Sequence, residues 1–193
     1  MKKIIYFLML SSVFLVGCTT SRLGYIDTSG TLIMKPQFED AREFSHALAR
    51  VKIRGLWGYI DTTGNVVIPP RYSAARNFSG DLARVKKHKK WGYIDKKGIF
   101  VIKPEFERAS NFSEELALVR KNKLWGYINQ RGSFVIAPQF HDARSFSEGF
   151  ASVRIGKSWG YINAKGAQVI KPLFKEAKDF RTGIALIIIN ARN

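Results

Sequence analysis

Short stretches in which bulky apolar residues alternate with small or polar ones recur along this chain at a fixed interval. In the central copy the alternation runs over 91–95, and further apolar stretches follow at 100–102 and 116–120. In the last of these, Ala117 and Val119 fall on the same face. A period of two residues is typical of half-buried strands, so the pattern predicts three strands in each unit.

The unit repeats every 34 residues, and five copies account for 23–193. The copies begin LGYID, WGYID, WGYID, WGYIN and WGYIN, with Leu23 in the first tryptophan place. Self-similarity at a fixed period indicates a repeat architecture and no particular reaction. The recurring tryptophans are Trp57, Trp91, Trp125 and Trp159.

Turn residues separate the predicted strands. Asp95 and Gly98 stand three apart after the first strand, where an Asx side chain and a glycine with positive φ would form a tight turn. Pro104 has a counterpart in every copy and should end the second strand, since proline cannot donate to a ladder. The connection over 104–113 must then cross back over the sheet, as a short fourth strand or an extended crossover.

The pattern WGYID-x-x-G-x-x-V-I-x-P-x-F-x-x-A-x-x-F resembles the WG repeat, also called the KWG repeat, of bacterial envelope and secreted proteins. This resemblance covers almost all of 23–193 and implies an all-β, propeller-like fold, with no shared activity. We expect five units in a five-bladed propeller-like ring, closed by pairing of the apolar C-terminal strand at 184–189 with the first repeat. That strand should then be well buried. The alternative is an open β-solenoid.

The first residues have a different character. Lys2 and Lys3 precede an apolar run over 4–15, and Leu15-Val16-Gly17-Cys18 follows. The run is too short for a folded transmembrane span and is typical of a cleaved export signal. The tetrapeptide resembles a lipobox, so we expect a cleaved signal peptide at 1–17, a lipid on Cys18 and a short tether at 18–22. Thr19 fits outer-membrane sorting if the source is Gram-negative.

Charge is the second informative feature. The net charge of +17 favours anionic partners. The four segments that join a third strand to the next first strand hold thirteen basic residues and no acidic one, and their turns should project from one side. They predict a basic face; the alternative is that lysines only protect strand edges and keep the protein soluble. The candidate anion-binding residues are Lys52, Lys86, Lys87, Lys89, Lys90, Arg120, Lys121, Lys123, Arg154 and Lys157.

Other candidate sites have structural alternatives. The tryptophans could stack on sugars or bases, but a repeated Trp beside Gly favours packing between units. The Asp or Asn after each first strand is explained better by turn hydrogen bonds than by a metal site. The three histidines fall at different places in the unit, which gives no recurrent metal-ligand set, and catalytic fingerprints are missing. We therefore expect neither an enzyme, nor a metal site, nor a cofactor.

These observations favour a membrane-anchored, non-catalytic binding module of the bacterial cell envelope. Its basic face would meet an anionic polymer, a lipid head group or an acidic protein, and sequence-specific nucleic-acid binding is not expected. The alternative is a structural lipoprotein that docks on a larger envelope complex, with its charge incidental.

Overall fold

The structure is a computed structural model that describes residues 21–189. Within this range the regular elements are strands, β1 to β20, and no helix occurs. This confirms the all-β prediction. Residues 1–20 lie outside the described range, and with them the predicted signal peptide and Cys18.

Hydrogen bonding groups the strands into four complete four-stranded antiparallel sheets between two two-stranded ones. The first pair is β1 (Leu23–Ile26) and β2 (Leu32–Phe38), and the last is β19 (Glu176–Ala177) and β20 (Ile187–Ile188). The complete sheets, in hydrogen-bonded order, are β3 (Asp40–Ala41), β4 (Leu48–Ile53), β5 (Leu56–Asp61) and β6 (Val66–Tyr72); β7 (Ala74–Ala75), β8 (Ala83–Lys87), β9 (Lys90–Ile94) and β10 (Phe100–Phe106); β11 (Arg108–Ser113), β12 (Leu116–Lys121), β13 (Leu124–Ile128) and β14 (Phe134–Phe140); and β15 (Asp142–Ala143), β16 (Phe150–Ile155), β17 (Ser158–Asn163) and β18 (Gln168–Phe174).

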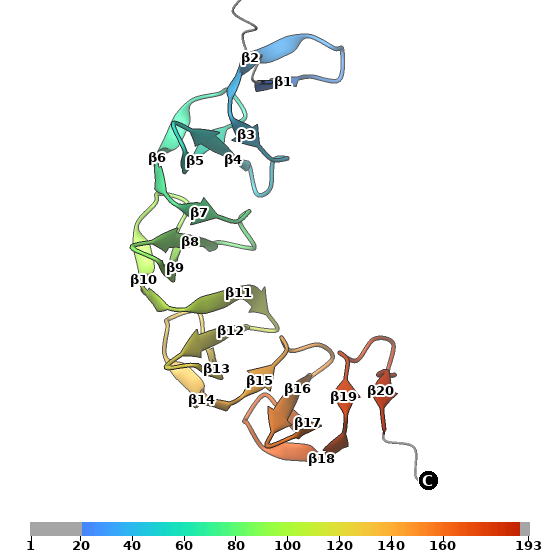
Figure 1. Cartoon of the computed structure of the whole chain (residues 1–193). Coiled ribbons are helices and arrows are strands. Elements are labelled where there is room, and N and C mark those ends of the chain that lie inside the picture. The colour runs from blue at the N-terminus through green and yellow to red at the C-terminus, as the bar shows by residue number, and fades with distance from the viewer. Residues whose placement is uncertain (1–20, 190–193) are drawn as a thin grey trace, which may run out of the picture.

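The sheets stand side by side along an arc (Figure 1). The strands β3, β7 and β11 lie toward the concave side, and β6, β10 and β14 follow the convex side. Each long outer strand leads directly into the first strand of the next sheet. A complete sheet therefore combines the crossover and third strand of one sequence repeat with the first two strands of the next.

The predicted strands are present, with two corrections. The strand predicted over 184–189 is reduced to Ile187–Ile188. A fourth strand occurs in the crossover, as proposed, and β12 includes the whole of the predicted third strand. The second strand, however, does not stop near Pro104, because β10 continues to Phe106. It is the edge strand of its sheet and is bulged where it passes β9, so a residue without an N–H is tolerated there.

The glycine beside each tryptophan allows that bulge. A Cβ on Gly92 would lie 2.5 Å from the carbonyl oxygen of Ile102 and 2.8 Å from the nitrogen of Pro104. The same crowding, against the equivalent carbonyl and proline, occurs at Gly58, Gly126 and Gly160. The WG motif therefore records a close backbone approach inside one sheet as well as packing between sheets.

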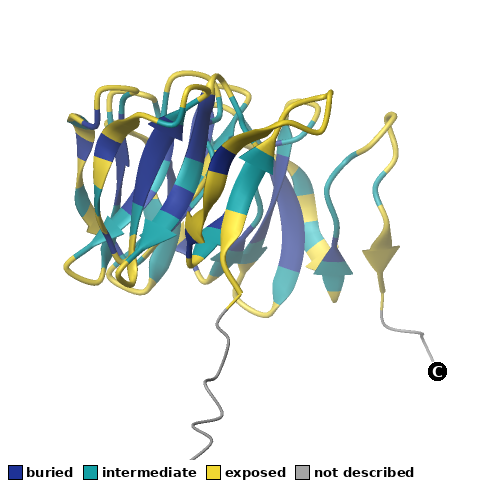
Figure 2. Ribbon diagram, turned by 90° about the horizontal axis from the view of Figure 1, so that it is seen from above, coloured by how far each residue is buried: buried dark blue, intermediate teal, exposed yellow. Residues whose placement is uncertain are grey.

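The hydrophobic core lies between neighbouring sheets. Figure 2 shows buried segments along the strands and exposed loops at both edges. Tyr59, Tyr93 and Tyr127 are almost fully buried, and each hydroxyl donates a 2.7 Å hydrogen bond to a backbone carbonyl of the following sheet. Tyr25 and Tyr161 make the same bond at 2.8 Å. The same contact, a tyrosine whose hydroxyl is hydrogen-bonded to the following sheet, is thus repeated along the arc.

The predicted closing pair is not formed in this structure. The strand β1 bonds to β2 and β20 bonds to β19, and the two pairs lie at opposite ends of the arc (Figure 1). The C-terminal strand is also not buried as predicted: Ile184 is 74% exposed and Ile189 is 64% exposed. No first strand lies beside this apolar segment, so one of its edges is unpaired within the described part of the chain.

Candidate anion-binding site

The predicted basic turns project from one edge of the arc. They are 53–56, 87–90, 121–124 and 155–158, and each joins two antiparallel strands of a complete sheet. Since every complete sheet has the same strand order, the four turns are equivalent in position. Lys52, Lys86, Arg120 and Arg154 stand at corresponding places just before them, half-buried. The structure therefore brings the predicted residues to a common edge.

Acidic residues of the crossovers return to the same edge, which the sequence analysis did not foresee. The carboxylate of Glu39 accepts a 2.9 Å hydrogen bond from the backbone N–H of Gly55. Lys121 pairs with Glu105 at 2.6 Å, and Arg120 lies 3.8 Å from Glu107. These contacts partly neutralise the turns at 53–56 and 121–124, so the edge is not uniformly basic.

The turn at 87–90 is different. Its crossover carries Ser73 and Ala74 where the first crossover has Glu39 and Asp40, and the Ser73 hydroxyl donates to the Lys86 carbonyl. The structure records no ion pair for Lys86, Lys87, Lys89 or Lys90 among the residues it describes. We name these four residues the lysine cluster. Arg154 and Lys157 at the last turn also have no ion pair among the described residues, so the lysine cluster differs in holding four such cations rather than two.

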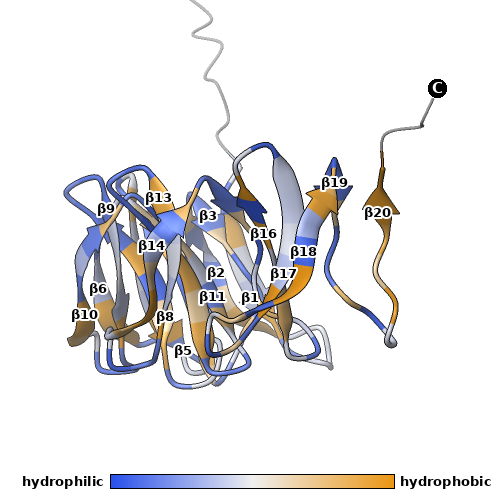
Figure 3. Cartoon of the chain, turned by 90° about the horizontal axis from the view of Figure 1, so that it is seen from below, coloured by the Kyte–Doolittle hydropathy of each residue, from blue (hydrophilic) through white to orange (hydrophobic). Residues whose placement is uncertain are grey.

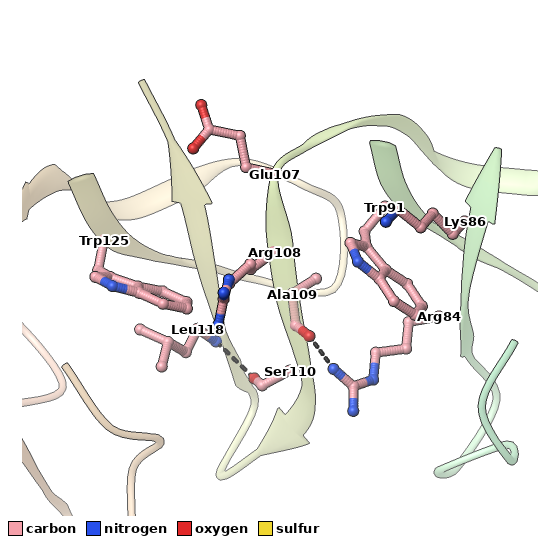
Figure 4. A pocket seen from close by; sticks show the side chains of 9 residues that line it. All are labelled: Arg84, Lys86, Trp91, Glu107, Arg108, Ala109, Ser110, Leu118 and Trp125. Carbon is pink, nitrogen blue, oxygen red and sulfur yellow. Dashed lines mark hydrogen bonds between the residues drawn. The ribbon is translucent and has the colours of Figure 1, made fainter. Parts of the chain in front are cut away.

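An open pocket of about 500 Å³ lies beside the lysine cluster, between the sheets β7–β10 and β11–β14 (Figure 4). Two tryptophans stand on opposite sides of it, one from each sheet. Its lining is Arg84, Lys86, Trp91, Glu107, Arg108, Ala109, Ser110, Leu118 and Trp125. Three of these side chains are cationic. The only carboxylate among them, Glu107, faces Arg120 at 3.8 Å.

Arg84 is the most constrained cation of the pocket. One Nη donates across the gap to the carbonyl of Ala109, while Nε is buried with no partner among the described residues. Its guanidinium lies 5.5 Å from the Trp91 ring centroid, and Arg76 and Lys86 lie 5.9 Å from the same ring. Burial, and next the charge of Arg76, lower the pKa of Arg84 below its ordinary value. Like charges gathered around one ring favour an incoming anion.

The four tryptophans lie in or against the hydrophobic clusters between neighbouring sheets. Trp159 is 8% exposed, and Trp57, Trp91 and Trp125 are half-buried against the clusters between sheets. Trp91 and Trp125 also line the pocket, so packing does not remove them from contact with a ligand there. The two interpretations of these residues are compatible.

The Asx residues form turns. Oδ1 of Asp95 accepts hydrogen bonds from the backbone N–H groups of Lys97 at 2.9 Å and Ile99 at 2.8 Å, and Asn129 makes the same pair of contacts. Gly98 has φ +80°. Over residues 21–189, no group of three His, Cys, Asp or Glu side chains is placed to hold a metal ion.

The sequence signal for the lysine cluster was the pair Ser73 and Ala74, which depart from the acidic residues of the first crossover. This signal can be interpreted only when the strand register is known, because it is the register of β7 and β8 that places residue 74 opposite Lys86. The pocket lies between two sheets and has no signal in any single repeat. Over residues 21–189 the structure contains no helix that is long and apolar enough to cross a membrane.

Taken together, stacked antiparallel sheets built from one repeated unit define a β-repeat protein. The family model described as WG containing repeat matches the chain five times, at residues 24–57, 57–91, 91–125, 125–158 and 159–191. The chain therefore belongs to the WG-repeat family. No curated protein and no solved structure gives a match.

Proposed function

We propose that this protein is a membrane-anchored, non-catalytic module of the bacterial cell envelope that binds an anionic polymer along its basic edge. The observation that carries the proposal is the lysine cluster, which lacks acidic partners in the described structure and borders a pocket with Arg84 and Arg108. In the pocket an anion would meet Arg84, which the hydrogen bond to the Ala109 carbonyl already holds in place, so little ordering of that side chain would be needed on binding.

A polymer fits this edge better than a single small anion. Equivalent basic turns follow one another from sheet to sheet, so a chain of negative groups could contact several in succession. The lysine cluster would be the central contact, and the turns with Glu39 and Glu107 would contribute less. Trp91 and Trp125 offer aromatic surface to a sugar ring or base within the pocket.

Binding to duplex DNA, used only as a polyanion of known charge spacing, tests the proposal. Each neutralised phosphate contributes about 0.9 to the slope of log K against log salt, so four to six contacts give about −4 to −5. Replacing Lys86, Lys87, Lys89 and Lys90 by Glu should reduce both affinity and slope. We expect little dependence on base sequence, because phosphate contacts carry no base information.

The matched control reverses four exposed cations elsewhere, namely Lys97, Lys103, Arg131 and Lys165. Lys96 is left out because it pairs with Asp81 at 2.9 Å. Both variants change the net charge equally. If the control weakens binding as much as the cluster variant, net charge alone governs binding and the proposed site does not exist.

The membrane anchor rests on the sequence around Cys18, and the same proposal places a lipid there. Labelled palmitate should be incorporated by the wild type and not by Cys18→Ser, which should remain unprocessed or become soluble. An unchanged membrane fraction of Cys18→Ser after a carbonate wash would refute the anchor. Sorting to the outer membrane, in a Gram-negative source, is part of the proposal.

A further inference from the structure

The two ends of the arc are complementary halves of one sheet. In each complete sheet a third-strand segment such as β4 bonds to a first-strand segment such as β5. At the ends, β19 and β20 provide the crossover and third strand, while β1 and β2 provide the first and second strands. Joined in the order β19-β20-β1-β2, they would reproduce the strand order of a complete sheet.

The repeat defines the register of that missing contact. Val51 pairs with Gly58, and Lys52 pairs with Trp57. Ile187 and Ile188 lie four periods of 34 residues after Val51 and Lys52, and Gly24 and Leu23 lie one period before Gly58 and Trp57. The expected pairs are therefore Ile187 with Gly24 and Ile188 with Leu23.

Burial identifies the same partner independently. Four of the five hydrophobic clusters contain the isoleucine of a first strand, namely Ile60, Ile94, Ile128 or Ile162, and these are at most 1% exposed. The fifth cluster, around Tyr161 and Ala177, contains none. Their counterpart, Ile26, is 65% exposed at the other end of the arc. The fifth cluster thus lacks the first-strand isoleucine that the other four clusters contain, and the equivalent residue of the first repeat, Ile26, is exposed instead.

The exposed third strand also lacks the charges that protect its counterparts. Residues 184–189 are uncharged, with Leu186 and Ile188 where β8 carries Arg84 and Lys86. Figure 3 shows β20 as an apolar strand at the end of the molecule. Unpaired apolar edges without lysine are templates for strand addition. This edge is thus suited to pairing with another strand.

We propose that a second copy of this chain docks β1 and β2 against β19 and β20 and completes a four-stranded sheet between the two molecules. Within one molecule the two ends stand apart (Figure 1), so internal pairing would require the arc to close, whereas two copies can join in the shape observed. The contact is head-to-tail, so each pair leaves one free end of each kind and can grow further or close into a larger ring.

Disulfide trapping in the full-length chain tests both the partner and the register. One tagged chain carries Leu23→Cys and a differently tagged chain carries Ile188→Cys, each with Cys18→Ser to remove the native thiol. Directly opposed strand residues lie within the Cα separation that a disulfide spans. On oxidation, we expect a disulfide that joins the two tags. The control replaces Leu23→Cys with Ile26→Cys, three residues out of register, and should give at most a trace of that product.

Each other outcome refutes the proposal. Equal cross-linking in the control would mean nonspecific collision. A chain with both Leu23→Cys and Ile188→Cys that forms an internal disulfide at monomer mass would show closure within one molecule. Light scattering gives a second readout: the mass should rise above 21.9 kDa with concentration, and Ile26→Asp with Ile187→Asp should hold it at the monomer value. Both sites are exposed, so the circular dichroism spectrum should not change.

Discussion

Lys89 lies in a backbone conformation that is costly for a residue with a side chain. Its φ is 65°, in the left-handed region, and that of His88 is 49°. Gly55 occupies the equivalent position in the preceding basic turn, at φ 78° and without the penalty. The turn requires a positive φ at this position, and the lysine cluster meets it with a cation where glycine would be easier to accommodate.

Replacing Lys89 by glycine should separate stability from binding. Relief of the left-handed strain, less the flexibility that glycine adds to the unfolded chain, should raise stability by about 0.5–1 kcal/mol. Loss of one contact should lower the salt slope for duplex DNA by about 0.9. Thermal melts and salt-dependent binding isotherms measure the two effects.

Lys123→Gly is the matched control. Lys123 has φ 66°, but its turn is held by Glu107, whose carboxylate accepts from the Lys123 N–H. We expect a similar gain in stability and a smaller loss of affinity. Equal losses of affinity in the two variants would argue against a special role for the lysine cluster.

Single residues were the most predictable level of this molecule. The Asp95 turn and Gly98 follow from local hydrogen bonding and φ, and both were predicted correctly. The Trp-Gly pair predicted packing between units and not the close approach of Gly92 to Ile102 within one sheet, because that partner is set by the bulge. Pro104 misled the strand assignment, since the rule that proline ends a strand applies to central strands and β10 is an edge.

At the scale of the elements, the tyrosines of the first strands connect each sheet to the next. Tyr59, Tyr93 and Tyr127 each donate to a carbonyl 17 residues further along the chain, in the following sheet, while the ring fills the core between the two sheets. Burial, the largest cause in each case, raises the pKa of all three above the ordinary value of 10.0. The folded state therefore holds these protons more tightly than the unfolded state does.

This makes stability sensitive to alkali. The contribution of the buried tyrosines to the free energy of unfolding is complete below pH 10.0, where the folded and unfolded states both keep the proton. It is lost as the pH rises toward the pKa of the folded state. Each buried tyrosine should contribute a decline of about 1.4 kcal/mol per pH unit above that point. Tyrosinate absorbance and circular dichroism should therefore change together in an alkaline titration.

Tyr127→Phe should reduce the alkaline slope, at a cost of about 1 kcal/mol for the lost bond to the Arg144 carbonyl. If tyrosinate absorbance develops fully while the circular dichroism signal is intact, these side chains are not buried residues that join neighbouring sheets.

For the whole molecule, the repeat period predicted the sheets but not how they combine. Strand pairing places crossover residues opposite residues next to the basic turns, as with Asp40 and Lys52. The charge pattern along the sequence did not reveal this register. The acidic residues on the basic edge were missed for this reason, and the pocket beside Trp91 was missed because it lies between two sheets. The pairing of the two ends is absent from this structure. Closure depends on the rotation between sheets, which a pattern within one repeat does not specify.

Deletion of residues 184–193 tests how far the sheets depend on one another. It removes β20 and takes Ala185 from the fifth cluster, but leaves the other four clusters intact. In an arc where each unit contacts only its neighbours, the loss should stay local. We expect amide hydrogen exchange to quicken in β17 and β19 and to remain slow in β4, β8 and β12. At a concentration where the chain is monomeric, loss of protection throughout, including β4 at the far end, would mean that the two ends support one another in a closed ring, because within one molecule only a ring transmits the loss of the last strand to the first sheet.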